Sequence, residues 1–117
     1  MNFSTLVIWG ILAHVVADWF LQNHWMSENK KDLGHPAAWV HSLIHFACFL
    51  PFGYELATIV FVTHILIDTR KPLEWWRKIV KQSTPEQAGP AFIPFAMWQD
   101  QMAHVAVIIL TAAYLTR

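Results

Sequence analysis

The sequence has little charge, a single cysteine and no excess of basic residues. Charged residues make up 14% of its 117 positions, and eight Lys and Arg residues balance eight Asp and Glu residues. A chain without net charge offers no basic field for a nucleic acid, so nucleic-acid binding is excluded as a leading function. Cys48 stands alone, which excludes an internal disulfide, a CxxC pair and a cysteine cage for zinc. Any metal site must therefore use nitrogen and oxygen ligands.

Hydrophobic residues are abundant where charge is scarce. They make up 56% of the chain, above the usual level of about 45–50%. They concentrate in four segments, residues 3–21, 37–52, 54–69 and 91–115. The first and last are long enough to span a bilayer, the middle two are shorter, and all are apolar around most of their circumference. The sequence therefore predicts an all-α integral membrane four-helix bundle, a single transmembrane domain over residues 1–117.

Helix breakers fall between these segments. Pro36 opens the second, Gly53 separates the second from the third, and Pro72 ends the third. Residues 73–82 alternate aromatic, aliphatic and basic side chains at near-helical spacing, which predicts a short interfacial helix between helices three and four. Residues 83–90 are polar and predict a linker.

Basic residues indicate an orientation in the membrane. Lys30 and Lys31 occupy the first loop, five more basic residues lie between positions 70 and 81, and the second loop has none. The positive-inside rule places the first and third loops in the cytoplasm and both termini outside. We therefore expect a multi-pass protein of the cell inner membrane, with membrane lipids as partners and a homo-oligomer left open.

Each segment also carries polar residues four positions apart, on one helical face. They are His14, Asp18 and Gln22, then His41 and His45, then His64 and Asp68, and finally Asp100 and His104 with Gln101 adjacent. Counted from the cytoplasmic ends, the histidines and Asp100 lie about 8–15 Å deep. An ionisable side chain at the bilayer centre costs about 2.5–3.5 kcal/mol, so a shared depth predicts an internal polar site. His24 and His35 fall outside this layer and are interpreted as ordinary loop residues.

Histidine and carboxylate are ligand types for Zn²⁺ and for non-haem Fe or Mn, so we predict a divalent metal, with Zn²⁺ first. The predicted ligands are His14, Asp18, His41, His45, His64, Asp68, Asp100 and His104. A carboxylate that does not bind the metal, Asp18 or Asp100, is the predicted general base. Gln22 and Gln101 are predicted to orient water or to polarise a carbonyl. Lys71, one turn beyond Asp68, is expected either to pair with it or to receive an anionic headgroup at the interface.

These motifs resemble a known family. The order HxxxDxxxQxxWMxxNK from His14, HxxxH from His41, THxxIDxxK from Thr63 and DQxxH from Asp100 is similar to a family of small, uncharacterised bacterial and phage inner-membrane proteins, a domain of unknown function. The resemblance implies a fold of a few transmembrane helices and supplies no activity. A looser likeness, in ligand pattern alone, exists to membrane-embedded metal hydrolases that bind zinc through His and Asp on several helices.

The leading hypothesis is a membrane-embedded divalent-metal-binding protein that acts as a metal-dependent hydrolase on a lipid-like or membrane-associated substrate. A bound ion would lower the pKa of water to about 7 and generate hydroxide. One alternative is an ion or proton transporter with a His/Asp relay, although residues 105–115 offer few polar groups to continue a pathway. A haem protein with two facing histidines, and a non-enzymatic structural or regulatory phage-type membrane protein, are the others.

Overall fold

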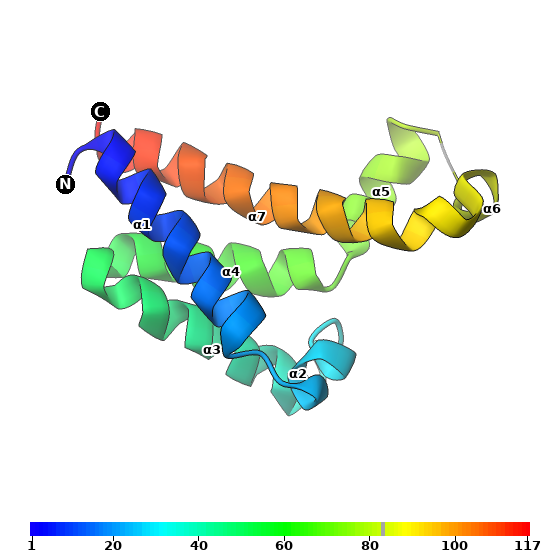
Figure 1. Cartoon of the computed structure of the whole chain (residues 1–117), viewed down its shortest axis with the longest axis horizontal. Helices are drawn as coiled ribbons and strands as arrows, with labels where there is room; N and C mark the ends of the chain where they lie inside the picture. Colours follow the sequence, from blue (N-terminus) through cyan, green and yellow to red (C-terminus); the bar gives the residue numbers. More distant parts are fainter. Residues whose placement is uncertain (83) are drawn as a thin grey trace.

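Every element is helical in the part of the chain that the computed structural model describes, residues 1–82 and 84–117 (Figure 1). The predicted all-α class is therefore confirmed. The elements are α1 (Phe3–Val15), η1 (Val16–Phe20), α2 (His24–Asn29), α3 (Pro36–Phe49), η2 (Leu50–Phe52), α4 (Tyr54–Asp68), α5 (Lys71–Ile79), α6 (Pro85–Ala88), η3 (Gly89–Ala91) and α7 (Phe92–Leu115).

The four hydrophobic segments form the four long helical units. α1 continues into η1 and α3 into η2, whereas α4 and α7 are single helices. α3 packs against α4, α4 against α7, and α1 against both α3 and α7. Figure 1 shows α1 crossing the others obliquely, with both termini at one end of the molecule and α5 and α6 toward the other.

A helix is also present between the third and fourth segments, where the sequence predicts an interfacial helix. α5 covers Lys71–Ile79, so it begins two residues before the predicted stretch and ends three residues before the end of that stretch. Pro72 lies in its first turn, where a missing N–H costs nothing. The location of this helix at a membrane surface stays a prediction.

Two short helices replace predicted loops. α2 forms in the first loop because the Asn23 side chain accepts a hydrogen bond from the Met26 backbone N–H at 2.9 Å, which caps the helix start. α6 forms in the predicted linker through a capping box between Thr84 and Gln87. The first residue of that linker, Ser83, lies outside the described residues.

The two histidines that we interpreted as loop residues differ in role. His24 is exposed at the start of α2. His35 instead caps α3, because its Nδ1 accepts a hydrogen bond from the Ala37 N–H at 3.1 Å. Its interpretation as an ordinary loop residue was therefore wrong. The proline after it starts a helix, and the first backbone amides of a helix need hydrogen-bond acceptors.

Among the described residues, length and hydropathy give one candidate membrane span, where the sequence predicted four. The continuous helical stretch Phe3–Phe20 is long and apolar enough to cross a bilayer, whereas Pro36–Phe52 is apolar but shorter. α4 has 15 residues, which reach only about 22 Å against a hydrocarbon core of about 30 Å. α7 is long enough, but its polar residues from Gln99 to His104 lower its hydropathy.

An apolar cluster fills the bundle near the end that carries the termini. Its buried members are Leu6, Ala13, Phe49, Leu56, Ala57, Val60, Ile108 and Ala112. Gly10 lets α1 approach α7 closely here, because a Cβ added at this position would lie 2.7 Å from Ile108 Cγ2. The small residue therefore sets the separation of these two helices.

Gly10→Ala is expected to destabilise the protein by about 1–3 kcal/mol through overpacking. An alanine in an open helix position would instead gain about 0.5–1 kcal/mol over glycine. The free energy of unfolding in detergent measures the difference. In an Ile108→Ala variant the methyl group that clashes with the new Cβ is absent, so Gly10→Ala should no longer destabilise the protein. If Gly10→Ala destabilised the wild type and the Ile108→Ala variant equally, the close approach of α1 and α7 would be contradicted.

Candidate metal centre

Seven buried His and Asp side chains meet between the four long helical units. Each is at most 6% exposed, although the helices that carry them expose many large hydrophobic residues. They are His14 from α1, Asp18 from η1, His41 and His45 from α3, His64 and Asp68 from α4, and His104 from α7. The i, i+4 spacing places each pair on the inward face of its helix.

Asp18 lies in a turn of different geometry from the rest of its helix. The Leu21 N–H donates to the Val16 carbonyl at 3.0 Å, a π-helical bond that closes η1. Such single π turns interrupt α-helices frequently at functional sites. The helix also ends there, so Gln22 lies beyond it. Our prediction that Gln22 extends the same helical face was therefore wrong.

A first group of candidate ligands comprises Asp18, His41, His45 and His64. Each offers one ligand atom, and these atoms all lie within 4.8 Å of one another. His41 Nε2 is 3.0 Å from both Asp18 Oδ1 and His64 Nε2, and His45 Nε2 is 3.5 Å from Asp18 Oδ1. Neighbouring ligand atoms of a tetrahedral ion with bonds of about 2.0 Å are separated by about 3.3 Å. The group thus has the dimensions of a zinc-type site.

A second group adjoins the first and shares one residue with it. It comprises His64, Asp68 and His104, again with mutual distances within 4.8 Å. His64 Nε2 lies 2.8 Å from Asp68 Oδ2, and His104 Nε2 lies 3.1 Å from Asp68 Oδ1. His64 is therefore the one residue common to both groups.

Several of these atoms have no hydrogen-bond partner among the described residues despite complete burial. They include Asp18 Oδ1, Asp68 Oδ2 and His45 Nε2. An unsatisfied buried polar atom costs about 1–3 kcal/mol, and more when it is charged. The short distances to Asp18 Oδ1 and Asp68 Oδ2 therefore lack the angles of hydrogen bonds, although the other oxygen of each carboxylate is hydrogen-bonded. Unsatisfied oxygen and nitrogen atoms this close together suit a cation. The donor set fits a divalent metal of the Zn²⁺, Fe or Mn type.

The other two predicted ligands lie beside the groups. His14 Nε2 is 3.7 Å from Asp18 Oδ2 and bonds Gln101 Oε1 at 3.0 Å. Asp100 Oδ2 is 3.7 Å from His104 Nε2. Gln101 also donates to Asp18 Oδ2 at 2.8 Å, so it links a candidate ligand to His14. Outer contacts of this kind fix the orientation of metal ligands.

The structure adds a cation, Lys30, that the sequence analysis assigned to membrane orientation and to the first motif but not to the site. Lys30 Nζ lies 3.9 Å from Asp18 Oδ1 and 4.0 Å from Asp68 Oδ1. Lys71 is exposed and makes no ion pair with Asp68 within the described ranges, so of its two predicted roles the pairing was wrong, and contact with an anionic headgroup stays a prediction. The difference follows from α2, which folds back with Met26 buried and brings Lys30 over the carboxylates.

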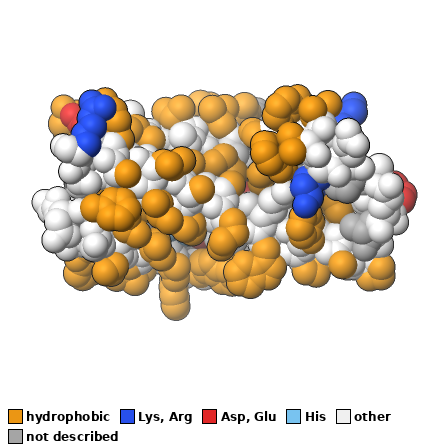
Figure 2. Space-filling model, turned by 90° about the horizontal axis from the view of Figure 1, so that it is seen from above, with side chains coloured by type: hydrophobic (Ala, Val, Ile, Leu, Met, Phe, Trp, Pro, Cys, Tyr) orange, Lys and Arg blue, Asp and Glu red, His pale blue; other side chains and the backbone are white. Residues whose placement is uncertain are grey.

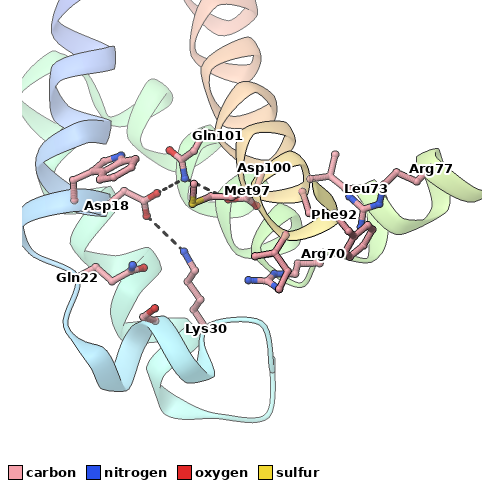
Figure 3. Close-up of a pocket in the computed structure, with 14 residues that line it drawn as sticks. Asp18, Gln22, Lys30, Arg70, Leu73, Arg77, Phe92, Met97, Asp100 and Gln101 are labelled. Atoms are coloured by element: carbon pink, nitrogen blue, oxygen red, sulfur yellow. Dashed lines mark hydrogen bonds and ion pairs between the residues drawn. The ribbon is translucent and has the colours of Figure 1, made fainter. Parts of the chain in front are cut away.

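A cavity of about 300 Å³ opens beside the centre (Figure 3). All four residues that the sequence predicted to be catalytic line it, although they come from η1, the loop after η1 and α7. The lining comprises Asp18, Trp19, Gln22, Ser27, Lys30, Arg70, Leu73, Arg77, Phe92, Ile93, Ala96, Met97, Asp100 and Gln101. Gln22 Oε1 is buried there and has no partner in the described part of the chain. A small molecule in this cavity would reach Asp18 directly.

Fold and site together define an all-helical protein with a buried histidine and aspartate centre next to an open cavity. Residues 6–117 match the family described as "Protein of unknown function (DUF3307)". Since the match covers almost the whole sequence, the chain belongs to this family, and the predicted resemblance to an uncharacterised domain is confirmed at that level. No curated protein and no solved structure matches the chain.

Proposed function

We propose that this protein is a membrane-embedded, divalent-metal-dependent hydrolase that acts on a lipid-like substrate. The observation that carries the proposal is the convergence of His and Asp ligand atoms from four helical units, with two buried carboxylate oxygens that have no hydrogen-bond partner in the described part of the chain. Interhelical hydrogen bonding in membranes needs no such excess of histidine, because Ser, Thr, Asn and Gln serve equally well.

The distribution of polar and apolar side chains supports a membrane environment. The buried residues include five histidines and two aspartates, while Ile8, Trp19, Phe20 and Leu110 are each more than 60% exposed. Figure 2 shows hydrophobic side chains along the full length of one face, with few charged groups between them. Exposed apolar patches of this extent are unusual in monomers that dissolve in water and typical of a lipid contact surface.

The ends of the bundle support the orientation that the basic residues indicate. Both termini lie at one end, next to the apolar cluster (Figure 1). Lys30, Arg70 and Arg77 line the cavity toward the other end. We infer by the positive-inside rule that the end of the bundle with the cavity lies on the cytoplasmic side.

Hydrolysis is the chemistry that this site suits best. A divalent ion held by these side chains would supply a nucleophilic hydroxide, because it would lower the pKa of bound water to about 7. Asp100 lines the cavity and lies 3.7 Å from His104 without belonging to either ligand group, so it is placed to accept a proton. Gln101 is fixed by His14 and Asp18 and can orient water or polarise a carbonyl.

A transport function fits less well. An ion pathway requires polar groups on both sides of the site. The apolar cluster, which includes Phe49, Leu56 and Ile108, fills the bundle between the histidines and the end with the termini. The 300 Å³ cavity thus opens away from the end with the termini, which suits a pocket where a reaction occurs better than a pathway through the bundle.

Metal content tests the proposal. The protein purified in mild detergent should contain about one or two divalent transition-metal ions per chain by elemental analysis. Chelation should lower the thermal midpoint of unfolding, because a ligand at 1,000 times its Kd stabilises the folded state by about 4 kcal/mol. Folded protein that lacks such an ion, takes none up and keeps its midpoint in chelator would favour a purely structural polar core.

A further inference from the structure

Two arginines line the cavity without an acidic partner among the described residues. Arg77 is only 7% exposed, its Nη1 donates to the neutral Gln99 Oε1 at 2.7 Å, and its guanidinium lies 5.3 Å from the centre of the Phe92 ring. Arg70 precedes α5 and reaches the same cavity. Figure 3 shows both arginines and Lys30 around the pocket. A buried guanidinium held by a neutral amide and an aromatic ring keeps donors available for an anion.

The charges around the cavity leave an excess of positive groups. Lys30, Arg70 and Arg77 face two carboxylates, Asp18 and Asp100. Lys30 lies 3.9 Å from Asp18 and 4.0 Å from Asp68, a third carboxylate that does not line the cavity, whereas the two arginines have no carboxylate partner among the described residues. A divalent ion at the histidines would add positive charge to the region. The cavity therefore suits an occupant with at least one negative charge, and the planar guanidinium donors match phosphate oxygens in geometry.

Apolar side chains also line the cavity. Leu73, Phe92, Ile93, Ala96 and Met97 form this apolar wall, and Figure 3 shows Leu73 and Phe92 beside the two arginines. The adjoining helix α5 exposes hydrophobic side chains next to its basic residues, with Trp75 60% exposed and Ile79 51% exposed. A basic amphipathic helix with exposed tryptophan is typical of a membrane surface. A molecule that enters the cavity beside α5 would contact both the apolar wall and the two arginines.

We infer that this cavity binds a phosphate-bearing amphiphile, with Arg70 and Arg77 on the phosphate and the apolar wall on the start of the acyl chain. The inference deepens the proposed function and rests on it, since it names the substrate class of the same centre. It also assigns two residues to substrate binding that the sequence motifs do not include.

Binding of short-chain lipids tests this inference. Calorimetry on the detergent-solubilised protein should detect dioctanoyl phosphatidate at submicellar concentration, with dioctanoylglycerol and inorganic phosphate each binding about 10-fold more weakly or worse. Arg70→Gln and Arg77→Gln should each weaken phosphatidate binding by about 10- to 100-fold, because each removes a charge-assisted hydrogen bond to the phosphate. Arg117→Gln, which changes an exposed arginine at the chain end, is the matched control.

The outcomes separate this inference from the metal proposal. Metal content unchanged in Arg70→Gln, with phosphatidate binding lost, supports both. Metal bound while phosphatidate binding is absent, or insensitive to both arginine changes, overturns the lipid inference alone. Arginine-dependent phosphatidate binding by a protein that takes up no metal supports the lipid site and overturns the metal centre. Equal binding of inorganic phosphate would overturn the role of the apolar wall. Since Arg70 is exposed, its replacement tests the inference even if Arg77→Gln fails to fold.

Discussion

Replacing His64 with alanine is expected to lower metal affinity by about 100-fold or more. His64 is the one residue shared by the two candidate ligand groups, and it is buried between His41 and Asp68. If the apparent binding energy of a structural zinc site, about 10–16 kcal/mol, is divided over four ligands, each is responsible for about 2.5–4 kcal/mol. Metal content after dialysis against a metal buffer, measured on folded protein, reports the loss.

The matched control for that experiment is His24→Ala. His24 is exposed on α2 and belongs to neither ligand group, so its replacement should leave metal content unchanged. A polar core that only joins helices predicts a different pattern. Each histidine change would then lower stability by about 0.6 kcal/mol, with no metal signal to lose. Equal metal content in the wild type and in a His14, His64 and His104 triple variant would contradict the metal centre.

Much of the fold could be predicted because local chemistry decides it. Pro36 and Gly53 lie at helix boundaries in the structure as they do in the sequence pattern. Hydrophobic segments longer than a dozen residues, bounded by such breakers, have few alternatives to helices. α2 was missed because six residues carry no periodicity and the helix depends on one side chain, Asn23, as its cap.

The sequence predicted which residues form the site, but not how they divide into the two groups of candidate ligands. The i, i+4 pattern indicates an inward face on each helix, and that face holds for His41 and His45 and for His64 and Asp68. Which histidine meets which aspartate depends on helix rotation and on the π turn at Asp18, which spacing alone does not encode.

The cationic side of the cavity escaped sequence reasoning for another reason. Basic residues near the ends of apolar segments were assigned to membrane orientation, and Arg70 and Arg77 carry no motif that separates a pocket cation from a surface one. Only the packing of α5 beside the start of α7 buries Arg77 against Phe92 and Gln99. A basic residue that a short helix turns inward is visible only in three dimensions.

Leu12→Arg is expected to reduce the ratio of membrane-inserted to non-inserted protein by about 50-fold or more. Leu12 is 46% exposed near the middle of Phe3–Phe20, the stretch long and apolar enough to cross a bilayer. An arginine at the centre of a membrane span costs about 2.5–3.5 kcal/mol, whereas an exposed substitution in water usually changes stability by less than about 0.5 kcal/mol. Carbonate extraction of membranes, followed by quantification of the retained fraction, measures the effect.

Trp76→Arg is the matched control, because Trp76 has the same exposed fraction of 46% but lies on the basic helix α5. At an interface the added guanidinium meets lipid phosphates rather than hydrocarbon, so the retained fraction should stay close to that of the wild type. If both substitutions were equally harmless, or if the wild type were recovered without detergent in the soluble fraction, the exposed hydrophobic side chains would not face lipid. The centre would then belong to a protein whose apolar surface is covered by a partner or a second copy. Leu12 and Trp76 are equally exposed, so water would treat an arginine at either position alike. A bilayer would not, because it has hydrocarbon at its middle and phosphates at its surface.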